Sequence, residues 1–346
     1  MHGLVSIPSV SRQESEAVEW LVARMSERGF RAHVDDAGNA VGEIGDGPTH
    51  VVLLGHIDTV PGEIAVRIED GELVGRGAVD AKGPLAAFVA AATHVVPGVR
   101  VTVVGAVEEE SPTSAGARHR ATLPAPDWCV IGEPSGWDAI TVAYKGRLSL
   151  RVSLAREARH GAAPGPTCTE EALEVWRAIA DSSARRTPDA SGFAKLDCRL
   201  EGITGGITDG LVERAELRVG YRVPPGIATD ELERDVRAVA GAHTGDARVT
   251  VERVSSEEPA RTPRTSALAR AFVGAIAGAG GSATFKVKSG TSDMNILAPA
   301  WGCAMVAYGP GDSRYDHTPI ERLVLSDYTR AISTLRGVLE RASPTS

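Results

Sequence analysis

The pattern of hydrophobic and polar positions divides the chain into two outer parts and a middle part. Near the start, apolar residues recur at helical spacing over residues 18–25. This spacing predicts a helix that Ser11 or Ser15 caps and that ends at Gly29.

Three short, mainly apolar runs in the first part are typical of buried parallel strands. They cover residues 51–54, 101–107 and 129–132, and an alanine-rich helix is predicted over residues 84–92. After the middle part, buried-helix and buried-strand patterns return, with a last helix at about residues 326–340. We therefore predict an α/β domain with a mostly parallel sheet flanked by helices.

The middle part has a different period, because apolar and polar residues alternate along its strands. Its order is β-α-β-β-α-β, which indicates a two-layer α+β domain with one exposed sheet face. We therefore predict a discontinuous first domain, residues 1–146 plus 255–346, and an inserted domain, residues 147–254.

Composition and charge exclude several classes of protein. The 346 residues are 42% hydrophobic and 24% charged, as in ordinary globular proteins, and no apolar run is long enough to span a membrane. The start has no signal-peptide pattern and the four cysteines form no CxxC pair, so we expect a cytoplasmic protein with reduced thiols. The net charge of −8 argues against nucleic acid as a partner.

Histidine and carboxylate residues follow the three apolar runs. His56 and Asp58 come after the first run, Glu108-Glu109-Glu110 after the second and Glu133 after the third. In open α/β sheets ligands collect where strands end, so we expect these side chains to lie close together.

Two further residues extend this set: Asp80 in a glycine-rich segment and His317 in a polar loop. Taken alone, Asp80 could cap the following helix, and a lone loop histidine is usually solvated. Together with the residues at the strand ends, they predict a dinuclear metal site that activates water.

The order GHxD, GRGxxDxKG, EEE, GEP and DHTP resembles the M20 family of dinuclear zinc or cobalt hydrolases over essentially the whole chain. The resemblance implies two divalent ions, Zn²⁺ or Co²⁺. It assigns His56 and Glu133 to one metal position, Glu110 and His317 to the other, and Asp80 to a bridging position.

The same resemblance implies that Glu109 is the general base and that Asp58 supports His56. The acidic triplet leaves this register open by one residue. We favour Glu109 as base with Glu110 as ligand, because the insertion that follows is then shorter, and Glu108 with Glu109 is the alternative.

The inserted domain of the family usually mediates dimerisation, so the resemblance implies a homodimer. His160, in the segment ARHGAAP, resembles a histidine that reaches the site of the partner subunit and stabilises an oxyanion. Arg222 resembles the arginine that binds a substrate carboxylate. Gly290, Thr291 and Ser292 resemble the family's substrate-carboxylate loop.

Four segments, IDTVPG, EPSGWD, YKGR and SGTSDMN, resemble those of a subgroup of hydrolases. The members of this subgroup release lysine or ornithine from the C-terminal glutamate of an acidic amino-group carrier protein. The alternatives are a small-molecule deacylase, acting on N-acetylornithine, N-acetyl-lysine or N-succinyl-diaminopimelate, and an inactive scaffold. Because this chain is also acidic, carrier docking needs a local basic patch, for which we suggest Arg147, Arg151, Arg156 and Arg159.

Overall fold

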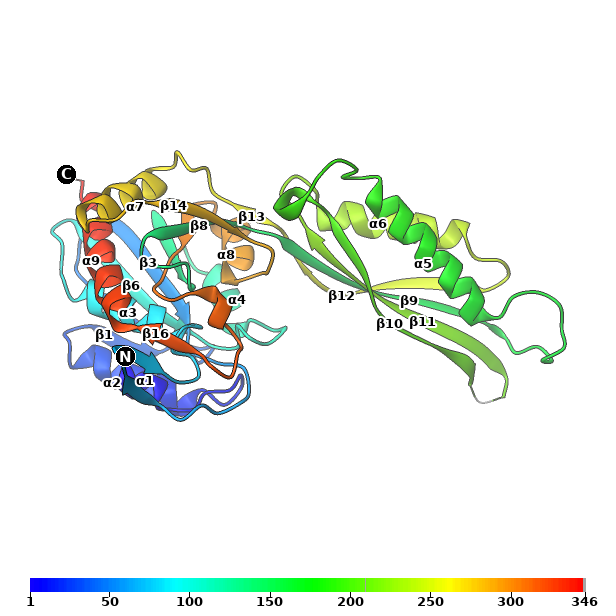
Figure 1. Ribbon diagram of the computed structural model, residues 1–346, viewed down its shortest axis with the longest axis horizontal. Coiled ribbons are helices and arrows are strands. Elements are labelled where there is room, and N and C mark those ends of the chain that lie inside the picture. The colour runs from blue at the N-terminus through cyan, green and yellow to red at the C-terminus, as the bar shows by residue number, and fades with distance from the viewer. Residues whose placement is uncertain (209, 345–346) are drawn as a thin grey trace. The chain divides into compact units, whose positions relative to one another are not determined.

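The computed structural model describes residues 1–208 and 210–344, and the chain forms two compact units. The first comprises Met1–Ala143, Arg261–Val287 and Ser292–Ser346, and the second Tyr144–Ala260 and Lys288–Thr291. In Figure 1 the first unit therefore carries both the blue and the red ends of the chain. Within the part of the chain described, no helix combines the length and the apolar character that crossing a membrane requires.

A nine-stranded sheet forms the centre of the first unit. Its strands are β1 (Arg31–Val34), β2 (Ala40–Ile44), β3 (Thr49–His56), β6 (Val99–Ala106), β7 (Trp128–Gly132), β8 (Ala139–Tyr144), β13 (Ala260–Arg261), β14 (Thr284–Lys288) and β15 (Ala304–Ala307). They are ordered β1-β2-β6-β3-β7-β15-β8-β13, with β14 also paired to β8.

The four central strands of this sheet, β6, β3, β7 and β15, run parallel to one another. On one side β2 is antiparallel to both β1 and β6, and on the other side β8 is antiparallel to β15. The predicted α/β class is confirmed. The sheet is mixed rather than mostly parallel, because antiparallel strands flank the parallel centre. The sequence pattern did not reveal these short flanking strands.

Seven helices are described in the first unit: α1 (His2–Val5), α2 (Ser15–Ser26), α3 (Lys82–Ala92), α4 (Ala115–Ala121), α7 (Ala267–Gly278), α8 (Asp293–Trp301) and α9 (Leu325–Ala342). Helix α9 packs on both α3 and α7, and α4 packs on α8. The N-caps that the sequence predicted for the helix now seen as α2 are wrong. Glu14 occupies the N-cap of α2, and the Ser11 hydroxyl donates instead to Asp58.

A small sheet in the same unit has the order β16-β5-β4 and comprises β4 (Arg67–Glu69), β5 (Glu72–Val74) and β16 (Arg322–Val324). It joins a segment shortly before Asp80 to a segment shortly after His317, because β5 and β16 are antiparallel partners. Residues far apart in the sequence are thereby held side by side near two of the predicted ligands.

The second unit is a four-stranded antiparallel sheet, ordered β10-β11-β9-β12, with two helices. Its elements are β9 (Gly146–Glu157), α5 (Cys168–Ala184), β10 (Asp197–Thr208), β11 (Val212–Val223), α6 (Thr229–Ala242) and β12 (Arg248–Glu257). The predicted β-α-β-β-α-β order is confirmed. Alternate residues of β9, from Leu148 to Leu154, pack in a core with α5 and α6, and the residues between them face away.

Candidate metal centre

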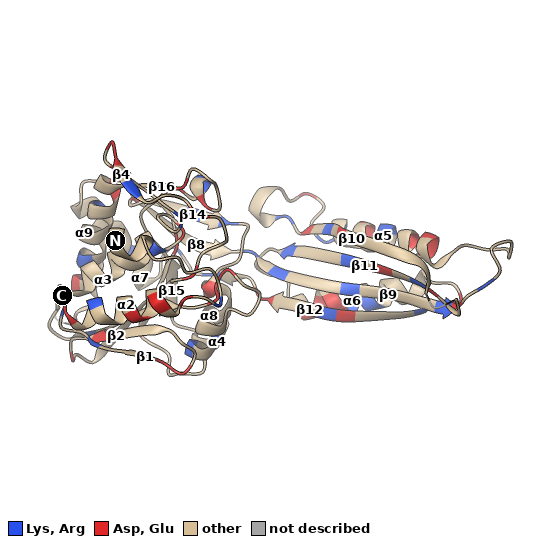
Figure 2. Ribbon diagram, turned by 90° about the horizontal axis from the view of Figure 1, so that it is seen from below, with Lys and Arg blue, Asp and Glu red and all other residues tan. Residues whose placement is uncertain are grey.

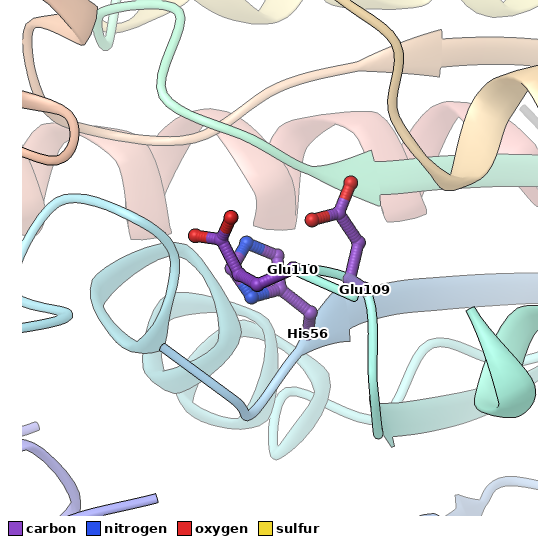
Figure 3. A group of neighbouring side chains, drawn as sticks. All are labelled: His56, Glu109 and Glu110. Atoms are coloured by element: carbon purple, nitrogen blue, oxygen red, sulfur yellow. The ribbon is translucent and has the colours of Figure 1, made fainter. Parts of the chain in front are cut away.

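Three neighbouring strands bring the predicted ligands to one edge of the central sheet. His56 is the last residue of β3, Glu109 and Glu110 lie in the turn after β6, and Glu133 follows β7. Figure 3 shows the carboxylates of Glu109 and Glu110 on the same side of this edge as the His56 imidazole. Because β6, β3 and β7 are parallel and in register, their carboxyl ends coincide.

Donor atoms gather in three overlapping groups, and within each group they lie within 4.8 Å of one another. The groups are His56–Asp80–Glu133, Asp80–Glu110–His317 and His56–Glu109–Glu110. The first two groups share Asp80 and contain the same residues as the two metal positions that the family resemblance implies.

Asp80 connects the two histidines through its two oxygens. Its Oδ1 lies 3.2 Å from His56 Nε2, and its Oδ2 lies 3.0 Å from His317 Nε2. The same His317 nitrogen is 2.8 Å from Glu110 Oε1. A carboxylate in this position can bridge two cations, one beside each histidine.

The ring orientation of His56 suits metal binding. Its Nδ1 lies 2.9 Å from the backbone oxygen of Asp58, to which it can donate. In the neutral ring, Nε2 then carries a lone pair and faces Asp80. Imidazole nitrogen with carboxylate oxygen is a donor set typical of zinc and related divalent ions. The residues present therefore fit a pair of divalent cations.

The charges of the site shift the pKa values of both histidines upward. Burial alone would lower the pKa of His56, but hydrogen bonds with Asp58 and Asp80 outweigh it and raise the pKa well above its usual value. Asp80 and Glu110 raise the pKa of His317 to about 10. Two cations would satisfy the same carboxylates in place of these protons.

Glu109 differs from the other carboxylates because its pKa is raised well above its ordinary value. Burial is the main cause, and the nearby charges of Glu133, Asp293 and Glu110 add to it, against the opposing effect of His56. A carboxyl group with a raised pKa can both accept and return a proton near neutral pH.

Hydrogen bonds to the acidic triplet favour one of the two registers left open by the sequence. The backbone N–H groups of Glu109 and Glu110 donate to Asp58, whereas that of Glu108 donates to Glu14. The Glu108 carboxylate accepts from the Thr113 hydroxyl and belongs to none of the three donor groups. This geometry supports Glu109 and Glu110 as the functional pair.

Two buried acidic residues of this region were missed from the sequence. Glu321 is fully buried beside the Asp80 segment, and Asp293, at the start of α8, is 2% exposed. Burial, with the charges of Asp58 and Glu133 and against that of His56, raises the pKa of Asp293 to about 8. Neither residue belongs to a periodic apolar pattern. The only sequence signal for Glu321 is that it follows the DHTP motif by a few residues.

The remaining predicted residues lie outside the three donor groups. His160 is exposed in the loop after β9, where its Nδ1 accepts the Ala162 N–H at 3.1 Å. Arg222 lies on β11, and its Nη1 is buried without a hydrogen-bond partner among the described residues. Both belong to the second unit, and their roles remain predictions.

Gly290 and Thr291 also belong to the second unit, whereas Ser292 belongs to the first. Ser292 is the N-cap of α8, and its hydroxyl accepts the Met294 N–H at 3.3 Å. Its lone pairs therefore serve the helix, although its hydroxyl hydrogen can still be donated. Substrate binding by these three residues stays a prediction.

The suggested basic patch is wrong for at least two of its four residues. The Arg156 side chain is 5% exposed and is paired with Glu171, Glu213 and Asp246. Arg151 is paired with two further glutamates, one on β11 and one on β12. Opposite charges in the second unit already neutralise these guanidinium groups, so they are not free to attract an acidic partner.

Comparison with known proteins gives consistent matches over nearly the whole chain. The model of peptidase family M20/M25/M40 matches residues 52–341. The chain is similar to "[LysW]-lysine hydrolase" of Deinococcus radiodurans, at 43% identity over 97% of this chain and 94% of that protein. It is also similar to "Putative [LysW]-lysine/[LysW]-ornithine hydrolase" of Pyrococcus furiosus, at 38% identity over 98% and 95%.

Among solved structures, aminopeptidase PepT from Bacillus cereus has a TM-score of 0.78 at 19% identity, covering 99% of this chain and 96% of that one. At this identity the match supports the fold alone.

Proposed function

The chain belongs to peptidase family M20/M25/M40, and we propose that it hydrolyses the amide that joins lysine or ornithine to a LysW-type carrier protein. The released amino acid would serve lysine or arginine biosynthesis. The two relatives named for this activity match nearly the whole chain, including the segments that carry the predicted ligands.

The observation that carries this proposal is the pair of donor groups that share Asp80, with Glu109 beside the same His56. Divalent cations, for which we propose Zn²⁺ or Co²⁺, would be held by His56, Asp80, Glu110, Glu133 and His317. When bound, such cations lower the pKa of water and polarise an amide carbonyl.

The protein's own part in the reaction is to move a proton. Glu109 takes the proton from the attacking water on one carboxylate oxygen. It then returns this proton to the nitrogen of the departing lysine or ornithine, so that a free amine leaves. Asp58 fixes the main chain of Glu109, and its backbone oxygen orients the His56 ring.

The second unit supplies the remaining groups in this proposal. Arg222 would pair with a carboxylate of the substrate, since its buried and unpaired Nη1 offers a donor. His160 would act in the site of a partner subunit within a homodimer. Its exposed position in the loop after β9 is compatible with that role.

Arg151 and Arg156 of the patch suggested from the sequence are engaged in ion pairs, so we propose a different basic surface for docking of the acidic carrier. The strand register places Arg214, Arg218 and Arg248 on the polar face of the second-unit sheet, and all three are exposed. In Figure 2 basic residues lie along β9 and β11. We assign carrier docking to these three arginines, because opposite charges attract the partner before contact.

The test is to supply the metal-depleted protein with Zn²⁺ or Co²⁺ and three substrates in parallel. These are carrier-linked lysine, carrier-linked ornithine and N-acetylornithine, with release of the free amino acid as the readout. The proposal expects release from at least one carrier-linked substrate. Cleavage of N-acetylornithine alone would favour the deacylase, and no cleavage of any of the three would overturn the proposed activity.

A further inference from the structure

Glu321 is a fully buried carboxylate whose hydrogen bonds end on the main chain that carries Asp80. Its Oε1 accepts the backbone N–H of Val79 at 2.9 Å and that of Asp80 at 3.0 Å. A buried carboxylate is costly unless its lone pairs are satisfied, so these two bonds fix the direction of the chain at Asp80.

The other oxygen of Glu321 is also engaged, by a residue of the same segment. Arg76 Nη1 donates to Glu321 Oε2 at 2.8 Å, and Arg76 Nε donates to the Gly62 oxygen at 3.0 Å. The backbone oxygen of Glu321 accepts the Gly75 N–H at 3.2 Å. Both ends of the segment 75–80 are therefore attached to this one residue.

Glu321 is in addition close in sequence to His317, whose Nε2 lies 3.0 Å from Asp80 Oδ2. One side chain thus links the segment with the shared carboxylate to the segment with the second histidine. Those two segments come from opposite ends of the first unit in sequence. Loss of this link would free Asp80 to move relative to His317 without removing any predicted ligand from the chain.

We propose that Glu321 is a positioning residue of the metal centre, which sets the place of Asp80 between His56 and His317. Arg76 supports it by neutralising the buried charge. The inference rests on the proposed function, since it assumes that these three residues bind divalent ions. Partners one step outside a metal site typically change metal affinity by roughly 10–100-fold when they are removed.

The experiment is a titration of the metal-depleted full chain with Zn²⁺ or Co²⁺ alone. Calorimetry measures the affinity for each ion, and visible absorption reports the environment of bound Co²⁺. In Glu321→Gln the side chain keeps its size, but its NH₂ group must face either Arg76 or the two backbone N–H groups. We expect its affinity for at least one of the two ions to fall by roughly 10–100-fold, with an altered Co²⁺ spectrum. Arg76→Gln should cause a smaller fall, because Glu321 keeps its bonds to Val79 and Asp80.

Glu213→Gln is the matched control, because Glu213 also joins a backbone N–H, that of Cys168, to an arginine but lies in the second unit. It should lower the unfolding temperature without changing metal affinity. If Glu321→Gln folds, an unchanged metal affinity and Co²⁺ spectrum would overturn the inference. If Glu321→Gln does not fold, an unchanged metal affinity in Arg76→Gln would overturn it instead. A wild-type protein that binds neither ion would instead overturn the proposed function.

Discussion

The carboxylate of Asp58 holds the backbone of Glu109, because its Oδ1 accepts the Glu109 N–H at 3.1 Å. Its Oδ2 accepts the next N–H, that of Glu110, at 3.0 Å. The contact with His56 Nδ1 is longer, at 3.6 Å, since that nitrogen is closer to the backbone oxygen of Asp58. The Asp58 carboxylate therefore acts mainly on the backbone of Glu109 and Glu110, whereas the Asp58 backbone oxygen orients the imidazole.

Asp58→Asn should slow turnover with little loss of folded protein. The amide can accept with only one atom, so one of the two backbone N–H groups loses its partner, at a cost of about 1–3 kcal/mol. We expect kcat to fall by roughly 10–100-fold while KM changes less. Steady-state kinetics with measured metal content would check this, and an unchanged kcat would refute the positioning role.

Glu109→Gln should slow turnover strongly while leaving metal bound. The amide cannot accept the proton from water, and loss of a general base typically costs roughly 10²–10⁴-fold. Glu108→Gln is the control, because its carboxylate faces Thr113 and Arg12 rather than the donor groups. Activity and metal content of both variants decide the register. An active Glu109→Gln beside an inactive Glu108→Gln would shift the base by one residue.

The positions of most candidate ligands could be inferred from the sequence because each follows a local signal. His56 and Glu133 end or follow continuous apolar runs, and parallel strands bring such ends together. The flanking strands β1 and β2 were missed, since they are short and do not form continuous apolar runs. Periodicity detects an element only when one face or both faces are buried along several residues.

Partners of buried charges could not be inferred in the same way. Glu321 and Arg76 meet only through the tertiary fold, and their hydrogen bonds to backbone groups leave no periodic signal. The predicted basic patch was wrong for the same reason. A list of arginines close in sequence does not reveal that Arg156 faces three carboxylates from other elements.

Arg156→Met should destabilise the second unit. Arg156 joins β9 to Glu171 on α5 and Glu213 on β11, and its removal leaves two buried carboxylates without a cation. We expect a loss of about 3 kcal/mol in the free energy of unfolding. Denaturant unfolding at pH 7 measures this loss. Arg177→Met on the exposed face of α5 is the control and should change stability by less than about 0.5 kcal/mol.

The stabilisation from Glu213 should also depend on pH. Burial opposes the shift, but the Cys168 N–H and Arg156 outweigh it and lower the pKa of Glu213 below its ordinary value of 4.5. Its stabilisation is therefore present above pH 4.5 and is lost as the pH falls through the lowered folded-state value. Unfolding curves from pH 7 to pH 3 should show this loss in the wild type and a weaker one in Arg156→Met. Equal slopes in both proteins would contradict the assignment.

Subunit mixing tests whether His160 acts across a homodimer. His160→Ala and Glu109→Gln should each be inactive as pure proteins. A mixed dimer would contain one site with an intact base and an intact histidine from the other chain. Random 1:1 assembly should therefore restore about a quarter of the wild-type sites. Sedimentation measures the dimer, and a confirmed mixed dimer without any activity would show that His160 does not act across the interface.

Carrier docking should weaken with salt and with loss of the exposed arginines on the sheet face. Arg214 and Arg218 lie on that face of β11, and both are exposed. Because exposed charges are screened over about 10 Å at 0.1 M salt, their attraction for an acidic carrier is lost as salt rises. The double variant Arg214→Gln/Arg218→Gln should slow carrier association and flatten its salt dependence. Arg177→Gln on α5 is the control, and stopped-flow association rates give the comparison. Wild-type association that is indifferent to salt, or a double variant with the wild-type rate, would remove the docking role from this face.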